Sequence, residues 1–411
     1  MRILWISQWF PPDLGALPAR LTEMAREWSA RGHDVTVVAA FPHHPLGVIP
    51  EAYRGKWVVE EKWEGIRVIR CRLWALPNRR MWQRILCQLS FAFTSVLLAL
   101  RRPERPDAVI VSSPPFFTGL AGILFARFHR ARFVFEVRDL WPEVFAATGV
   151  LSRGNLLYRL FEGLEKGFYR AAQRVVVVTK SFREDLARRG VPEEKLAVIP
   201  NGADLDFYAP APASPDLRRQ LGGEGRFLTT YVGTHGLATG LEQVLDAAEA
   251  LKGDPRFAFA FVGEGAQRDA LTEESRRRGL RQVVFHPALP KSQMPELYAS
   301  SDACVVCLRP LPLFEKFIPS KIFEILSCGR PLVAALAGEA AEIVRAAGGA
   351  VVPPGDGAAI AAALRRIRES PELARRMEKS GRRFVAENFD RRSLARRYLE
   401  VLSELAARGE L

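Results

Sequence analysis

The feature that most constrains the fold of this chain is a repeated order of short apolar strands and amphipathic helices. Residues 3–7 predict a buried strand, residues 17–28 place their apolar side chains on one stripe of a helix, and residues 34–40 predict a second buried strand. The same order returns at residues 228–232 and 241–251. Strands that alternate with helices form parallel sheets with helices on their faces, so the sequence predicts an α/β fold.

Length and one Pro/Ala-rich stretch divide this pattern into two domains. A chain of 411 residues exceeds what one core usually organises, and the stretch 209–215 is the best linker candidate. We expect an N-terminal Rossmann-like domain over 1–205, a C-terminal one over 206–385, and a last helix in 386–411 that packs back on the first. Doubly wound sheets bind ligands at the loops after their strands, so two such domains would face each other across a central cleft.

The excess of positive charge is concentrated in the first half of the chain. The formal charge is +13, of which +11 falls in residues 1–200 and +2 in residues 201–411. A basic surface attracts nucleic acid, anionic lipid or a phosphorylated substrate. The alternative is an arginine-rich composition in which many of the side chains are simply solvated.

One apolar segment favours a membrane surface over nucleic acid. Residues 85–100 are mostly apolar and have aromatic neighbours at Trp74 and Trp82, which suits a helix that lies on anionic lipid. The alternative is a buried helix of a two-domain protein. The basic residues on both sides of the segment are Arg79, Arg80, Arg84, Arg101, Arg102 and Arg105.

Neither a membrane span nor a secretory signal is expected, because no apolar run reaches about 20 residues and the start lacks a cleavage pattern. The chain contains five cysteines, and this odd number predicts reduced thiols in the cytoplasm. Cys304 and Cys307 have the spacing of a metal or redox pair. They lie in an apolar run that predicts a strand, where residues three apart point to opposite faces, so we expect neither role.

Glycine-rich loops follow two strands of the second half. Residues 233–240 contain Gly233, Gly236 and Gly240, and residues 263–265 read Gly-Glu-Gly. Glycines let backbone N–H groups approach a phosphate, and the N-terminus of a following helix adds partial positive charge. Tight turns without a ligand are the alternative.

A third segment joins Lys321 and Glu324 on one helix face. It begins Pro319-Ser320-Lys321, and Glu324 follows one turn later. The two side chains could form an exposed ion pair, which contributes little to stability. They could instead bind different parts of one nucleotide, with Lys321 on a phosphate and Glu324 accepting hydrogen bonds from the ribose hydroxyls.

With these segments in view, nearly the whole chain resembles glycosyltransferase family 4, which has the two-domain GT-B fold. The subgroup most similar to it contains the bacterial N-acetyl-L-fucosamine transferases of surface-polysaccharide assembly, including that of O-antigen. The stretches that carry the resemblance are residues 10–15, 31–36, 136–142, 198–204, 261–265, 319–324 and 352–356.

The resemblance implies transfer of a sugar from a UDP-sugar to an acceptor hydroxyl with retention of configuration. The sugar would be an N-acetylated hexosamine or deoxyhexosamine, and the acceptor a lipid-linked glycan at the inner face of the cell membrane. Glu324 would bind the ribose and Gly15 would lie beside the diphosphate. The remaining donor-site residues are Gly233, Thr234, Gly263, Glu264, Gly265, Arg309, Lys316, Ser320 and Lys321.

The chain departs from the family at the positions that neutralise the diphosphate. Where many members have basic residues after the first strand of the second domain, this chain has Thr234 and Thr239. A second glutamate, usual eight residues before Glu324, is replaced by Lys316, with Glu315 beside it. The compensating charge would come from Lys321, with Arg309 or Lys316 in support.

On the acceptor side we expect His43, His44, Arg138 and Asp139. Arg138 and Asp139 stand where the family often has a His-Asp pair, and we assign them a role in orienting the acceptor. A structural salt bridge is the equal alternative. Together with Lys321, which would stabilise the leaving diphosphate, they are the predicted catalytic residues.

We expect no metal and no cofactor besides the UDP-sugar co-substrate. Asp204 and Asp206 match an Asp-x-Asp metal motif, but the family keeps a similar acidic stretch there without metal. Two competing functions remain: a UDP-sugar 2-epimerase of GT-B architecture, which needs no acceptor, and a nucleic-acid-binding protein, for which no recognition motif is found.

Overall fold

The computed structural model describes residues 1–13, 15–44, 47–76 and 81–407. The predicted basic residues Arg79 and Arg80 lie outside the described residues. By its contacts the chain divides into one unit of Met1–Pro200 with Arg391–Leu411 and a second unit of Asn201–Asp390. The stretch 209–215 therefore lies inside the second unit and is not the linker.

The first unit contains an eight-stranded sheet in the order β3-β4-β2-β1-β5-β6-β7-β8. Neighbouring strands pair in parallel, except that β3 pairs antiparallel with β4 at one edge. The order reverses between β1 and β5, which is where a doubly wound sheet binds ligands. The strands are β1 (Arg2–Ser7), β2 (Asp34–Ala40), β3 (Val58–Trp63), β4 (Ile66–Cys71), β5 (Ala108–Ser113), β6 (Arg132–Val137), β7 (Arg174–Val177) and β8 (Leu196–Val198).

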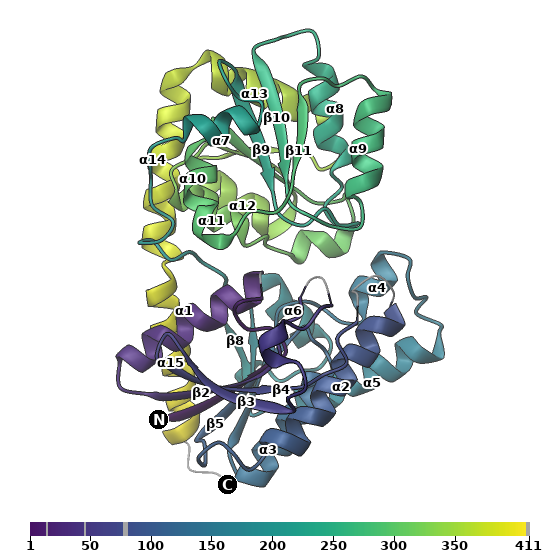
Figure 1. Ribbon diagram of the computed structural model, residues 1–411, viewed down its shortest axis with the longest axis vertical. Coiled ribbons are helices and arrows are strands. Elements are labelled where there is room, and N and C mark those ends of the chain that lie inside the picture. Colours follow the sequence, from purple (N-terminus) through teal and green to yellow (C-terminus); the bar gives the residue numbers. More distant parts are fainter. Residues whose placement is uncertain (14, 45–46, 77–80, 408–411) are drawn as a thin grey trace. The chain divides into compact units, whose positions relative to one another are not determined.

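Helices cover both faces of this sheet (Figure 1). One face carries α1 and α15, which pack against each other, and the other carries α2, α3 and α5. The helices are α1 (Ala16–Ala30), α2 (Met81–Ala99), α3 (Thr118–His129), α4 (Glu143–Ala147), α5 (Leu156–Ala171), α6 (Lys180–Arg188) and α15 (Arg391–Ala407), with short 3-10 turns at Glu51–Tyr53 and Glu193–Lys195.

The last helix completes the core of the first unit. The ring of Trp5 in β1 stacks on Trp28 of α1 at 5.2 Å, and Tyr398 of α15 meets Trp28 edge-on at 5.5 Å. The indole Nε1 of Trp28 donates a hydrogen bond to the Ala395 carbonyl at 2.8 Å. All three rings are buried, so a large apolar contribution to the stability of the first unit comes from the end of the chain.

The second unit is built on a six-stranded parallel sheet in the order β11-β10-β9-β12-β13-β14. This is the doubly wound order, and it reverses between β9 and β12. The strands are β9 (Phe227–Val232), β10 (Phe257–Val262), β11 (Val283–His286), β12 (Ala303–Cys307), β13 (Leu332–Ala335) and β14 (Ala350–Val352). The predicted α/β fold with two Rossmann-like domains is confirmed.

Helices also cover both faces of the second sheet and separate its core into two clusters. Cys304 belongs to one cluster and Cys307 to the other, so the two thiols lie on opposite faces of β12, as expected. The helices are α7 (Pro215–Gln220), α8 (Glu242–Ala250), α9 (Arg268–Arg277), α10 (Met294–Ala299), α11 (Lys321–Ser327), α12 (Gly338–Ala346), α13 (Gly357–Glu369) and α14 (Pro371–Asn388), with 3-10 turns at Lys291–Gln293 and Pro312–Lys316.

Candidate functional site

In the second unit the strand order reverses where β9 and β12 lie side by side, and the predicted donor residues gather around this point. The glycine-rich loop 233–240 follows β9, and the loop 263–265 follows the neighbouring β10. Arg309 follows β12, and its backbone N–H donates to the Ala238 carbonyl at 3.0 Å. Segments far apart in sequence thus meet at the carboxyl edge of one sheet.

The two glycine-rich loops are joined by backbone hydrogen bonds. The N–H of Gly233 donates to the Val262 carbonyl at 2.9 Å, and that of His235 donates to the Glu264 carbonyl at 2.9 Å. Gly263 has a φ of 147°, and a Cβ atom there would overlap the Gly233 carbonyl oxygen. A side chain at this position would separate the loops, so glycine is required for their close approach.

Lys321 of α11 reaches back to the first of these loops. Its Nζ donates to the Tyr231 hydroxyl at 3.0 Å, and that hydroxyl donates to the Thr234 carbonyl at 2.9 Å. A Cβ atom on Gly233, whose φ is 128°, would lie 2.6 Å from Nζ. The ammonium group therefore lies against the glycine backbone, where it could meet an anion held by the loop.

Glu324 lies one helical turn after Lys321 and has a buried tyrosine as a partner. The hydroxyl of Tyr298 donates to Glu324 Oε2 at 2.9 Å. Burial, together with the charge of Glu324, raises the pKa of Tyr298 well above its usual value, so the tyrosine remains a proton donor. This bond fixes the orientation of a half-buried carboxylate beside Lys321.

Two further residues at this site were not predicted from the sequence. His235 is fully buried, and neither ring nitrogen has a hydrogen-bond partner among the residues that the structure describes. Burial, followed by the positive charges of Arg268 and Lys321, lowers the pKa of His235 to about 4. Arg268 begins α9, directly after the Gly-Glu-Gly loop, and its Nε lies 3.7 Å from Glu264 Oε2.

Three other predicted donor residues, Arg309, Ser320 and Lys316, lie between the end of β12 and the start of α11. Arg309 Nη2 lies 3.6 Å from Glu242 Oε1, which partly neutralises it. Ser320 precedes α11 but makes no capping hydrogen bond through its side chain, and Lys316 ends a 3-10 turn before it. Asp204 Oδ1 accepts from the backbone N–H of Asp206 at 3.1 Å, so the acidic motif forms a local turn.

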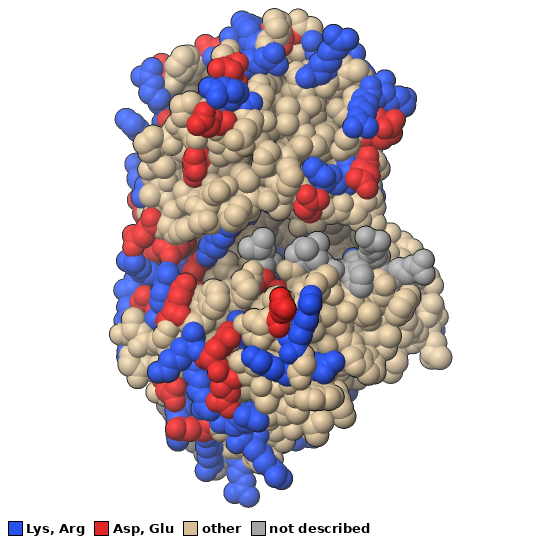
Figure 2. All heavy atoms as spheres, in the orientation of Figure 1, with Lys and Arg blue, Asp and Glu red and all other residues tan. Residues whose placement is uncertain are grey.

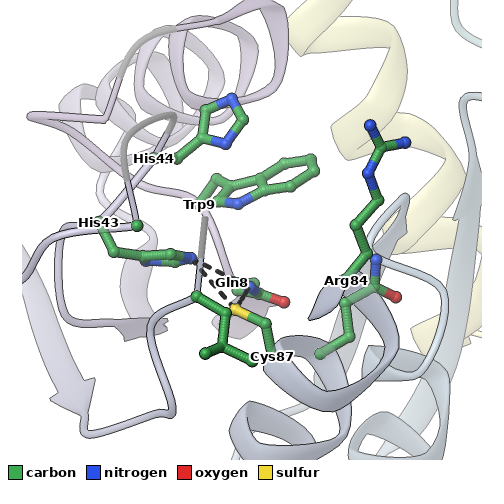
Figure 3. A pocket seen from close by; sticks show the side chains of 9 residues that line it. Gln8, Trp9, His43, His44, Arg84 and Cys87 are labelled. Atoms are coloured by element: carbon green, nitrogen blue, oxygen red, sulfur yellow. Dashed lines mark hydrogen bonds between the residues drawn. The ribbon is translucent and has the colours of Figure 1, made fainter. Parts of the chain in front are cut away.

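In the first unit the strand order reverses between β1 and β5, and a small pocket opens beside the end of β1. Figure 3 shows Trp9 next to His44, with Arg84 rising from α2 on the side opposite His43. The Trp9 and His44 rings are 4.8 Å apart. The residues that line the pocket are Gln8, Trp9, His43, His44, Gly47, Leu76, Arg84, Cys87 and Gln88.

The two predicted histidines are held differently in this pocket. The Nδ1 of His43 lies 2.8 Å from the Phe41 carbonyl and must donate to it, which leaves Nε2 to accept from Gln8 Nε2 at 3.2 Å. Burial lowers the pKa of His43, consistent with this neutral ring. His44 is only half buried.

Asp13 fixes the loop that carries both histidines. Its Oδ1 accepts from the backbone N–H groups of His43 and His44, each at 2.9 Å. Burial raises the pKa of Asp13 to about 6 despite these bonds. Since Asp13 lies between β1 and α1 in the chain, it links the first loop of the sheet to the second.

Arg138 and Asp139 follow β6, but neither lines the described pocket. Although both residues are described, no ion pair within 4.0 Å joins their side chains, while each charge acts on the other electrostatically. Burial raises the pKa of Asp139 to about 6 and lowers that of Arg138 to about 10. The buried pair in this region is Arg20 with Glu136, 3.0 Å apart and without exposed side-chain surface.

Gly15 precedes α1 with a φ of 139°. A Cβ atom there would approach the Pro18 ring only to 3.8 Å, so the backbone conformation and not crowding favours glycine. Its backbone is accessible at the end of the loop that follows β1.

Comparison with known families also divides the chain into two parts, with a boundary close to the end of the first unit at Pro200. Residues 15–202 match a family described as "Glycosyl transferase 4-like domain", and residues 214–384 match one described as "Glycosyl transferases group 1". Both matches lie in the predicted order and together span most of the chain.

Among known proteins the chain is similar to a "Putative colanic acid biosynthesis glycosyl transferase WcaI" of Escherichia coli K12. The two are 28% identical over 335 residues, which is 80% of this chain and 82% of the relative. Similar solved structures include sucrose-phosphate synthase of Thermosynechococcus elongatus, with a TM-score of 0.76, 20% identity and coverage of 99% of this chain and 100% of that one. A further one is HepE of Anabaena in complex with UDP-glucose, with a TM-score of 0.72, 21% identity and coverage of 98% and 100%.

Proposed function

The chain is a GT-B glycosyltransferase, with a glycosyl transferase 4-like domain followed by a group 1 domain, and we propose that its donor is a UDP-sugar. In the proposed reaction an N-acetylated hexosamine or deoxyhexosamine is transferred with retention to a lipid-linked glycan, in cell-surface polysaccharide biosynthesis such as that of O-antigen. The enzyme is proposed to act on the inner face of the cell membrane as a peripheral protein. The name of the similar Escherichia coli protein, a colanic acid glycosyl transferase, supports this setting.

The observation that carries the donor assignment is the position of Lys321 against the glycine-rich loops, with Glu324 one turn away. The loops bring main chain to the surface without intervening side chains, and Lys321 adds a positive charge within reach of the same surface. Glu324, oriented by Tyr298, can accept hydrogen bonds from two vicinal hydroxyls. A nucleotide would then place its diphosphate beside the loops and Lys321, and its ribose beside Glu324.

Arg268 supplies a second cation where the sequence lacks the usual basic residues. It flanks buried His235, whose pKa it lowers, and it lies at the first turn of α9. The positive end of that helix favours an anion at the same place. Lys321 is proposed to stabilise the departing diphosphate, with Arg268, Arg309 or Lys316 in support.

The acceptor is proposed to bind to the first unit, in the pocket that Trp9, His44 and Arg84 line. An indole face suits the apolar side of a sugar ring, and a guanidinium suits a phosphate of a diphosphate-linked lipid. Arg138 and Asp139 remain the proposed orienting pair at the end of β6.

In the retaining mechanism proposed here, the donor phosphate takes the proton of the attacking acceptor hydroxyl as the bond to the sugar forms on the face from which the diphosphate leaves. The protein then acts by orienting both substrates and stabilising the leaving group. This chemistry requires neither a metal nor an additional cofactor.

Calorimetric titration with UDP tests the donor assignment. We expect Glu324→Ala to lower the affinity for UDP by about 10- to 100-fold, since a charged acceptor of ribose hydrogen bonds is lost. Glu342→Ala, at an exposed carboxylate on α12, is the matched control. Unchanged affinity in Glu324→Ala would reject the site, and conversion of a UDP-sugar without any acceptor would favour the epimerase.

A further inference from the structure

Helix α2 has apolar side chains on its outer face as well as its inner one. Its inner face buries Cys87, Phe91 and Ser95 among others. A second stripe of apolar residues, spaced by three or four positions, points to solvent. Its members are Trp82, Leu86, Leu89, Phe93 and Leu97, of which Phe93 and Leu97 are 68% and 65% exposed.

The neighbouring helix α3 extends this stripe. Leu124 and Phe128, one helical turn apart, are 48% and 50% exposed. The ends of the two helices are tied together, because His129 Nε2 donates to the Leu100 carbonyl at 2.7 Å. We call the exposed apolar residues of α2 and α3 the outer apolar face. Figure 2 shows a mostly uncharged surface in the region of the first unit that holds α2 and α5.

The charged residues around this face are mainly basic. Residues 81–130 contain six arginines and two acidic residues, Glu104 and Asp107. Both acidic side chains interact with Arg2, at the start of β1. Arg105 Nε donates to the His129 carbonyl at 3.1 Å, which places this guanidinium where α2 and α3 end. Arg101, Arg127 and Arg130 are exposed there and have no ion-pair partner among the residues that the structure describes.

We propose that the outer apolar face, with Arg101, Arg127 and Arg130 at its end, docks on an anionic lipid bilayer. Large apolar side chains that share one surface are costly in water and mark an interaction site. Trp, Phe and Leu on a helix with arginines beside them fit the boundary between headgroups and acyl chains. Among the described residues, none of the helices combines the length and the apolarity that a membrane span needs.

The inference extends the proposed function, because it supplies a reason for α2 to border the acceptor pocket. Arg84, Cys87 and Gln88 line that pocket, while Trp82, Leu86 and Leu89 of the same turns lie on the outer apolar face. A lipid-linked acceptor could then keep its chain in the bilayer while its polar head reaches the pocket. Helix α2 would then contact both the bilayer that holds the lipid chain and the polar head of the acceptor.

Vesicle flotation tests the docking without any sugar transfer. The full-length protein is mixed with vesicles of phosphatidylcholine alone or with about one third phosphatidylglycerol. We expect it to float only with the anionic vesicles. Phe93→Ser/Leu97→Ser should lower the bound-to-free ratio by about tenfold, and Arg101→Gln/Arg127→Gln by roughly the same factor, most clearly at low salt.

Matched controls come from exposed residues of the second unit. Leu237→Ser removes an exposed apolar side chain, and Arg375→Gln/Arg376→Gln removes two exposed charges; both should float as the unchanged protein does. Equal flotation of the face variants and the controls would overturn the proposal. So would a concentration-dependent dimer that Phe93→Ser/Leu97→Ser abolishes without lipid, since a second copy would then cover the face. Calorimetry with UDP remains independent of either outcome, so a failed docking test leaves the donor site to be judged separately.

Discussion

The ammonium nitrogen of Lys321 lies 3.0 Å from the hydroxyl oxygen of Tyr231 and 4.1 Å from the centre of its ring. The Tyr231 proton is already donated to the Thr234 carbonyl, so the hydroxyl oxygen can only accept from Lys321. This partner is neutral and leaves the positive charge available. Lys321 is thereby held beside the glycine-rich loop, where the proposed leaving diphosphate would lie.

Replacing Lys321 should impair transfer more than folding. In Lys321→Ala we expect kcat to fall by about 10²- to 10³-fold, the usual effect of removing one group that stabilises charge in a transition state. Steady-state kinetics with a UDP-sugar and an acceptor would measure this. Lys379→Ala, at an exposed lysine on α14, is the control and should keep full activity. A Lys321→Ala enzyme with normal kcat would exclude the assigned role.

Gly263→Ala should disrupt the junction of the two loops. The added methyl group would overlap the Gly233 carbonyl, and the φ of 147° is unfavourable for alanine. We expect a loss of about 1–3 kcal/mol in the free energy of unfolding, together with weaker UDP binding. Thermal denaturation and calorimetry measure the two effects. Gly253→Ala, with no atom within 4 Å of the new Cβ, should change neither.

His235 should make the protein less stable in mild acid. Burial lowers its pKa from an ordinary value of 6.5 to about 4 in the folded chain, so the unfolded chain binds the additional proton between these two pH values. The free energy of unfolding should therefore decrease as the pH falls from about 6.5 to 4, by up to ~3 kcal/mol from this residue. Urea denaturation at several pH values, compared between the unchanged protein and His235→Phe, isolates the contribution. Parallel pH profiles for the two proteins would contradict it.

Arg84 should affect the acceptor and not the donor. Arg84→Gln removes the guanidinium that lines the pocket of the first unit. We expect the KM for a diphosphate-linked acceptor to rise by about tenfold, the loss of one charge-assisted hydrogen bond. The UDP affinity should not change. Arg159→Gln, at an exposed arginine on α5, serves as control, and a rise in the donor KM instead would refute the assignment.

The periodic pattern of apolar residues was sufficient to predict the parallel sheets and the loops that carry glycine. Gly233 and Gly263 follow strands directly, and Lys321 and Glu324 share one helical turn, so their neighbourhood is local in sequence. The fold class followed from the same alternation of strands and helices. Positions of this kind can be predicted from the sequence because short segments determine where a strand ends and which residues share a helix face.

Partners that meet across the sheet could not be predicted in this way. His235 and Arg268 lie on loops after different strands, and their proximity depends on β9 and β10 being neighbours. The first-unit pocket likewise combines Gln8, His43 and Cys87 from three separate segments. The linker was misplaced because the Pro/Ala stretch belongs to the second unit, which begins at Asn201. Ser214 at its end accepts the N-terminal hydrogen bond of α7, and its own backbone N–H donates to Ser300 Oγ.

The way in which Tyr398 closes against Trp5 and Trp28 has a consequence for synthesis of the protein. The first two hundred residues leave the ribosome long before the helix that covers their aromatic face, and the whole second unit must be translated in between. Until then the nascent N-terminal half lacks the Tyr398 ring that contacts its two tryptophans. This half therefore completes its core only after the second unit has been translated, although it is made first.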